Sequence, residues 1–179
     1  MLENLKIGKE YDGFLFLAES VRNPPVLHPH HHVELELSLV VEGEITYVMG
    51  GQRYCFPKRS LLWFFPEQEH QLVDRSADAA YYVAVFKPDL IRRACKGERY
   101  QGLTRKRPEG NKLLHCDLEP LVFDQLRKEM DAVGEDGLHP DLLNREAGFG
   151  VSKDFRFQHH DPDWLNAGLR HLLLYAWRL

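Results

Sequence analysis

The sequence predicts a mainly β domain, an antiparallel sandwich or small barrel, followed by C-terminal helices. Three observations lead to this prediction. Short runs of apolar and β-branched residues recur at spacings of about 8–12 residues through the first half of the chain. Turn signals rich in glycine and proline separate these runs. After residue 88 the hydrophobic period changes from that of a strand to that of an amphipathic helix.

Seven runs in the first half are expected to form strands. The clearest is the run at residues 34–41, in which apolar and polar residues alternate. Gly50 and Gly51 are typical of a two-residue hairpin turn between two of the strands. The expected strands cover residues 14–18, 34–41, 45–49, 52–56, 61–65, 70–73 and 80–86.

Two longer helices are expected in the second half. Residues 119–133 place apolar side chains along one stripe. The last helix begins with Asp161 as its N-cap and Pro162 at its first position, and its pattern continues to the end of the sequence. We therefore divide the chain into a barrel core at residues 1–88 and a helical appendage and connector at residues 89–179. Because the sequence stops within a helical pattern, we expect it to be cut before a further domain.

Composition excludes several classes of protein. A chain of 179 residues can bury one substantial core, and it has no run near the roughly 18 apolar residues that cross a membrane. The start of the chain lacks the apolar region of a secretory signal, and three dispersed cysteines are typical of reduced thiols, so we expect a cytoplasmic protein. The net charge of −4 gives no general attraction to DNA, and we expect the basic residues of 92–112 to form solvated surface.

Histidines and a carboxylate form the candidate metal site. In an extended chain His30 and His32 point to the same side, about 6–7 Å apart. Neighbouring His28 and His31 are expected to be bystanders. Three imidazoles and one carboxylate suit a divalent transition metal such as Zn, Ni, Fe or Mn. The candidate ligands are His30, His32, Glu36 and His70.

The spacing of these ligands sets a geometric condition. In a straight strand His32 and Glu36 would lie roughly 13 Å apart, which is too far to share one ion. A bend near Val33 is therefore required, and Glu34 remains a substitute for Glu36. In the alternative interpretation Glu34, Glu36 and Ser38 form a solvated face, and any remaining polar pocket is vestigial or filled with water.

Two motifs carry a resemblance to known families. His30-x-His32-x3-Glu36-x6-Gly43 resembles the first cupin motif, and Ser60-x5-Pro66 followed by His70 resembles the second, although Pro24 and Ser60 stand where the motifs carry glycine. Residues 30–86 further resemble the N-terminal ligand-binding domain of AraC-type transcription regulators. Residues 166–177 resemble the helix that follows the barrel in that family.

The resemblance implies a cupin barrel, that is a double-stranded β-helix or jelly roll, which binds a small effector. It also implies helices that dimerise the protein and a separate helix-turn-helix domain that contacts DNA. We therefore expect an effector-sensing and dimerisation domain, not an enzyme, with DNA contact only through a domain absent from this sequence and with no membrane partner. Residues 144–155 resemble a helix-turn-helix, but their second helix is short, and we expect a connecting loop.

Two residue sets follow from this expectation, each with an alternative. Aromatic side chains are expected to line the effector pocket, although core packing also explains them. The apolar stripe of the last helix is the candidate homodimer surface, and its burial within the chain is the alternative. The pocket candidates are Tyr47, Trp63 and Phe65, and the dimer candidates are Leu165, Leu169, Leu172 and Leu173.

A second function of a different class remains open. Three histidines and one glutamate leave two positions on an octahedral ion, which a substrate or O2 could use. The alternative to a sensor is therefore a stand-alone metal-dependent cupin enzyme, a dioxygenase or an isomerase.

Overall fold

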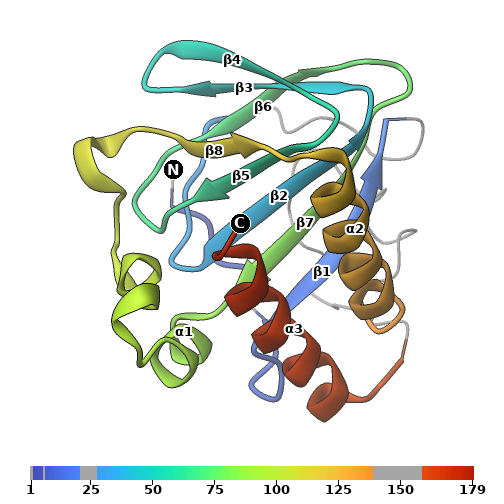
Figure 1. Cartoon of the computed structure of the whole chain (residues 1–179). Helices are drawn as coiled ribbons and strands as arrows, with labels where there is room; N and C mark the ends of the chain where they lie inside the picture. The colour runs from blue at the N-terminus through green and yellow to red at the C-terminus, as the bar shows by residue number, and fades with distance from the viewer. Residues whose placement is uncertain (1, 6, 21–27, 139–158) are drawn as a thin grey trace.

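The computed structural model describes residues 2–5, 7–20, 28–138 and 159–179. Two antiparallel sheets face each other (Figure 1), with strand orders β1-β7-β2-β5-β8 and β4-β3-β6. All seven strands expected from the sequence are present. The strands are β1 (Gly13–Glu19), β2 (Leu35–Glu42), β3 (Glu44–Met49), β4 (Gln52–Pro57), β5 (Ser60–Phe64), β6 (Gln71–Arg75), β7 (Ala80–Phe86) and β8 (Leu114–Asp117).

The strand β8 was not predicted. It pairs with the edge of β5, and the Ser60 hydroxyl donates a hydrogen bond to Oδ1 of Asp117 at 3.0 Å. β8 is short and largely exposed, so it lacks the apolar alternation that identifies a strand in a sequence. The larger sheet therefore takes a strand from beyond residue 88, and the expected division at that residue does not separate the sheet from the segment that follows it.

Glycine sets two of the turns. Gly50 and Gly51 have φ values of 55° and 78°, which confirms the predicted hairpin turn between β3 and β4. Gly43 joins β2 to β3 with a φ of 64°. A Cβ atom at Gly43 would lie 2.2 Å from the Ser76 hydroxyl, so this tight connection between the two sheets requires glycine.

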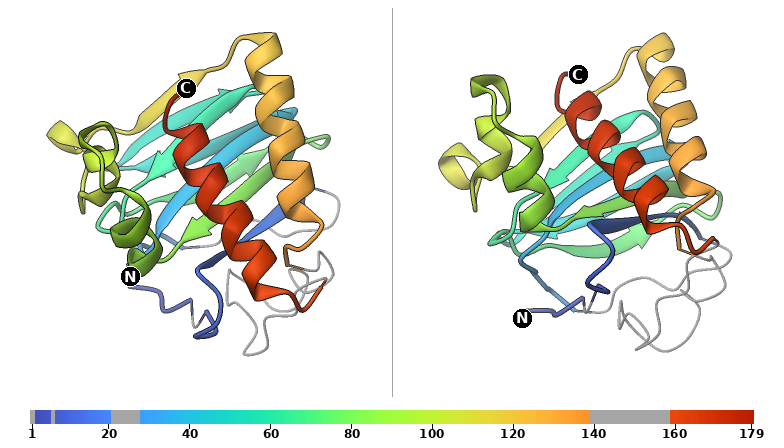
Figure 2. Two further views of the ribbon diagram at one scale, coloured as in Figure 1. Left: turned by 60° about the horizontal axis from the view of Figure 1, so that its bottom comes forward. Right: turned by 90° about the horizontal axis from the view of Figure 1, so that it is seen from below.

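Helices cover the outer face of the larger sheet (Figure 2). The Asp161 carboxylate accepts a hydrogen bond from the Trp164 amide at 3.0 Å, which confirms it as the N-cap of the last helix. No helix within the described ranges is long and apolar enough to cross a bilayer. The α-helices are α1 (Pro88–Ala94), α2 (Pro120–Gly134) and α3 (Pro162–Ala176), and the 3-10 helices are η1 (Glu98–Thr104) and η2 (Glu109–Asn111).

The larger sheet is buried on both faces. Its outer face packs against the helices and forms an outer core, and its inner face packs against the smaller sheet and forms an inner core. Strand β5 shows the alternation, since Leu62 and Phe64 belong to the inner core and Trp63 to the outer core. Glu36 and Ser38 are buried, so the interpretation of their face as solvated surface is wrong.

The apolar stripe of α3 is buried in the outer core of its own chain. The Trp177 ring, just after the helix, meets the Trp63 ring edge-on at 5.4 Å, and its indole N–H donates to the Arg99 carbonyl at 3.0 Å. The alternative of burial within the chain is therefore confirmed, and the expected dimer surface is wrong because the sheet already covers it. The four buried leucines are Leu165, Leu169, Leu172 and Leu173.

The basic segment at residues 92–112 lies at the surface. The Arg107 guanidinium donates to the Glu67 carboxylate at 3.0 Å, and Arg93 pairs with Asp12 at 2.6 Å. These exposed pairs agree with the prediction of a solvated surface. The helix-turn-helix-like segment at residues 144–155 lies outside the described residues.

Candidate metal and effector site

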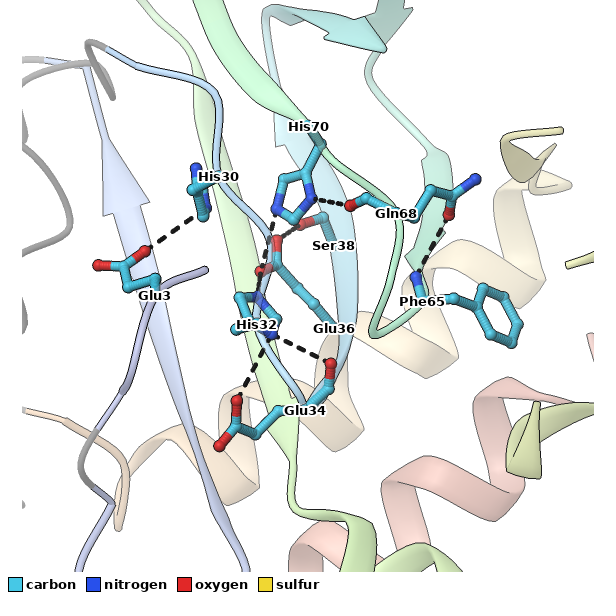
Figure 3. Close-up of polar contacts among 9 residues, drawn as sticks. All are labelled: Glu3, His30, His32, Glu34, Glu36, Ser38, Phe65, Gln68 and His70. Carbon is cyan, nitrogen blue, oxygen red and sulfur yellow. Dashed lines mark hydrogen bonds and ion pairs between the residues drawn. The ribbon is translucent and has the colours of Figure 1, made fainter. Parts of the chain in front are cut away.

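Two segments come together at the mouth of the barrel. The His30 amide donates to the His70 carbonyl at 3.1 Å, and the His70 amide donates to the His30 carbonyl at 2.9 Å. This isolated pair joins the approach to β2 to the approach to β6. It places the centroids of the two imidazole rings 4.5 Å apart. Both rings are drawn in Figure 3.

A bend brings His32 back to Glu36. Residues 33 and 34 form the bend that the geometry required, and β2 begins immediately afterwards. As a result, Nε2 of His32 lies 3.2 Å from Oε2 of Glu36. The Glu34 carboxylate instead lies 3.6 Å from Nδ1, on the other side of the same ring. The structure therefore places Glu36, and not Glu34, in the cluster.

Three histidines of the cluster lie close enough together to hold a single ion. One ring nitrogen from each of His30, His32 and His70 lies within 4.8 Å of the others, and all three side chains are buried. Metal–ligand bonds of about 2.1 Å place two ligand atoms about 3.0 Å apart when they are adjacent and about 4.2 Å apart when they are opposite. Glu36 Oε2 lies 3.2 Å from His32 Nε2 and 3.7 Å from His70 Nε2, within these limits.

Backbone carbonyls orient two of the rings. Nδ1 of His32 donates to the Glu34 carbonyl at 3.0 Å, and Nδ1 of His70 donates to the Gln68 carbonyl at 2.9 Å. Since a carbonyl oxygen can only accept, each Nδ1 carries a proton, and the Nε2 atom of each ring is directed into the site. Among the described residues, Nε2 of His70 is buried without a hydrogen-bond partner. A cation would satisfy that orphaned acceptor.

The charges of the cluster are coupled. Burial raises the pKa of Glu36, but contacts with His32 and His70 outweigh it and hold this pKa well below its ordinary range. Burial lowers the pKa of His32, but the hydrogen bond and the charge of Glu36 leave it raised above 6.5. Burial and the neighbouring His70 lower the pKa of His30 to about 4. The site therefore combines an ionised Glu36 carboxylate with a neutral His30 imidazole at neutral pH.

The surrounding cavity is small. Its volume is about 20 Å³, which is enough for an ion or a water molecule and too little for an organic effector. Phe64 stacks on the His70 ring at 4.3 Å, and Tyr47 lies against Phe64 at 4.7 Å. Burial raises the pKa of the Tyr47 hydroxyl well above its ordinary value, so this group stays protonated. Tyr47 thus lines the cavity, as expected for a pocket residue.

Trp63 and Phe65 lie elsewhere. Both belong to the outer core, on the opposite face of the larger sheet from Tyr47. Because successive strand residues point to opposite faces, Phe64 takes the inward position between them. The expected aromatic wall of Tyr47, Trp63 and Phe65 is therefore not formed in this structure.

Two residues of the site were missed in the sequence. Oε1 of Gln68 accepts from the Phe65 amide at 3.2 Å, and its Nε2 donates to the Lys112 carbonyl at 3.1 Å, which fixes the loop before His70. Glu3 also lines the cavity, and its Oε2 lies 3.8 Å from Nε2 of His30. Neither residue belongs to a motif. Glu3 reaches the site only because the N-terminal segment pairs with the chain at His31.

The fold and the site together define a class of protein. Two antiparallel sheets enclosing a histidine–carboxylate cluster, followed by helices, form a cupin barrel with a helical cover. The AraC-like ligand binding domain family matches residues 17–145 of the sequence. This match spans more than half of the chain, and the chain therefore belongs to the AraC-like ligand binding domain family.

Comparison with solved structures gives remote similarities. An apo form of ToxT from Vibrio cholerae aligns at 9% identity over 68% of this chain and 47% of its own, with a TM-score of 0.47. The AraC-like transcriptional activator CuxR aligns at 11% identity over 92% of this chain and 46% of its own, with a TM-score of 0.45. A Cupin 2 conserved barrel domain protein from Salinispora arenicola aligns at 22% identity over 45% of this chain and 66% of its own, with a TM-score of 0.36.

This chain thus spans about half the length of ToxT and of CuxR. No curated protein matches its sequence.

Proposed function

We propose that this chain is the effector-sensing domain of an AraC-type transcription regulator and that a divalent transition metal in the barrel takes part in sensing. One observation carries the metal proposal. The Nε2 atoms of His32 and His70 face the Glu36 carboxylate, while their Nδ1 protons are committed to backbone carbonyls. The proposed ligands are His30, His32, Glu36 and His70.

The chemistry of the four proposed ligands determines which ions suit the site. Three imidazoles and one carboxylate suit Zn, Ni, Fe or Mn better than the hard ions Mg and Ca, which take oxygen ligands. When bound, such an ion supplies a Lewis acid that can hold an oxygen or nitrogen atom of an effector. Phe64 and Tyr47 form the apolar wall beside that position.

Sensing also requires a change in the barrel. The cavity of about 20 Å³ is too small for an organic effector, so the mouth must open for one to enter. A small-molecule effector shifts the protein only through its different affinity for two arrangements. The proposal assigns DNA contact to a separate helix-turn-helix domain, and assigns homodimer contact to a surface other than the buried leucines of α3.

A metal titration tests this function. The protein is stripped with a chelator, dialysed and titrated with Co2+, followed by visible absorption, with His70→Ala as the site variant. The exposed His28 beside the cluster offers a matched control, His28→Ala. We expect one ion per chain in the unaltered protein and the control, and a loss of binding in His70→Ala. Equal binding in His70→Ala and the unaltered protein would contradict the proposed site.

A second measurement separates a sensor from an enzyme. Small carboxylates, phenols and sugars are screened for binding to the metal-loaded and metal-free protein, and the solutions are analysed for product. A sensor binds a compound and returns it unchanged. Turnover by the metal-loaded protein would instead support the dioxygenase or isomerase alternative.

A further inference from the structure

The N-terminal segment lies along the mouth of the barrel. The Glu3 amide donates to the His31 carbonyl at 2.8 Å, and Leu2 forms a parallel bridge with His31. Two residues further on, Leu5 is buried in the inner core. Glu3 is therefore held between two anchor points, next to the chain that carries His30 and His32.

The Glu3 carboxylate faces the histidine cluster. Its side chain is only 17% exposed, and its Oε2 lies 3.8 Å from Nε2 of His30 (Figure 3). It reaches the cavity from the N-terminal segment, whereas Glu36 reaches it from β2. Over the described ranges of the chain, no lysine or arginine pairs with this carboxylate. For a carboxylate in such a largely buried position, a metal ion would supply a cationic partner.

We propose that Glu3 is a further ligand of the metal site, so that the N-terminal segment closes the barrel mouth over the ion. This inference rests on the proposed metal site. Its Oε2 lies 3.8 Å from Nε2 of His30, a separation that two ligands of one ion can span, since such atoms lie about 3.0–4.2 Å apart. Together, Glu3 and Glu36 provide two negative charges, which balance a divalent ion.

A fifth ligand limits how an effector can reach the ion. With three histidines and Glu36, an octahedral ion has two further positions, and Glu3 takes one of them. One position then remains for an effector atom. The ion also links residues 2–5 to the barrel through Glu3. Removal of the metal therefore frees the Glu3 carboxylate.

The test is Co2+ titration of Glu3→Gln beside the unaltered protein, with Glu10→Gln as the control because Glu10 is an exposed residue of the same segment. We expect Glu3→Gln to lower Co2+ affinity about tenfold or more and to change the d–d absorption spectrum of the bound ion, while Glu10→Gln changes neither. Glu3→His supplies a different ligand atom, and it should restore affinity with a spectrum of its own.

The outcomes are distinguishable. If Glu3→Gln binds Co2+ with the affinity and spectrum of the unaltered protein, the assignment of Glu3 is overturned and the four-ligand site stands. If the unaltered protein binds no Co2+, the metal site itself fails and the Glu3 assignment fails with it. If Glu3→Gln lowers affinity but leaves the spectrum unchanged, Glu3 only supports the fold of the segment, and the assignment is again overturned.

Discussion

Nε2 of His32 lies 3.2 Å from Oε2 of Glu36, while Nδ1 of the same ring already donates to the Glu34 carbonyl at 3.0 Å. If His32 were neutral, two acceptor atoms would face each other in a buried site. A positive charge must therefore lie between them, either the second proton of the imidazolium or a metal ion. This competition between a proton and a metal at one position connects the charges of the site to its function.

The first prediction concerns the pH dependence of metal binding. The pKa of His32 is raised above 6.5, so below that raised pKa a proton occupies the Nε2 position that the ion needs. Metal affinity is therefore highest above the pKa of His32. Below that pKa it falls by about tenfold for each unit of decrease in pH. His30, with a pKa of about 4, stays neutral over this range and adds no competing proton. Co2+ titrations between about pH 8 and about pH 6 measure the slope. A constant affinity would contradict the competition.

The second prediction concerns the stability of the metal-free protein. Glu36→Gln removes the charge that His32 contacts, and should lower the free energy of unfolding by about 2 kcal/mol at neutral pH. Because the pKa of Glu36 is lowered in the folded state, its contribution is present above 4.5 and is lost as the pH falls through the folded-state pKa. Urea unfolding at several pH values should therefore show the largest difference near neutral pH. Glu44→Gln, at an exposed position of β3, is the control and should change little.

The third prediction concerns the loop that positions His70. Gln68→Ala removes both side-chain hydrogen bonds of Gln68, to the Phe65 amide and to the Lys112 carbonyl, without removing any proposed ligand. The loop that supplies the carbonyl partner of His70 Nδ1 then loses its support, and we expect metal affinity to fall about tenfold or more. Isothermal titration measures the change. An unchanged affinity would show that the bridge between His30 and His70 holds the ligand alone.

The fourth prediction concerns the last helix. Leu169 is fully buried against the larger sheet, so Leu169→Glu should destabilise the fold by about 4 kcal/mol or more. Trp164 is 67% exposed on the same helix, and Trp164→Glu is the matched control with little expected cost. Urea unfolding and sedimentation follow both variants. If Leu169→Glu converts a dimer into a folded monomer without changing the unfolding midpoint, α3 is a dimer surface and this prediction is contradicted.

Local patterns predicted much of this fold. Alternation identified β2, the paired glycines identified the β3–β4 hairpin, and Asp161 identified the start of α3. These features depend on interactions within a few residues, which a sequence displays directly. The required bend after His32 also follows from strand geometry alone, since the spacing of His32 and Glu36 is incompatible with a straight strand.

Features that depend on distant contacts were not predictable in the same way. An apolar helix stripe is equally suited to a partner chain or to its own sheet, and only the packing of α3 decides this. Trp63 and Phe65 share a face, but the sequence does not show which face of β5 points into the barrel. Glu3 and Gln68 are positioned by contacts with residues far away in the sequence, which no local pattern shows.

The most direct test of the metal proposal is anomalous X-ray diffraction from crystals of the metal-loaded protein, collected above and below the absorption edge of the added ion. The proposal predicts one anomalous peak inside the barrel, about 2.0–2.2 Å from the nearest nitrogen atoms of the three histidines and from a Glu36 oxygen. A barrel without such a peak, or a peak bound only by surface residues, would contradict it.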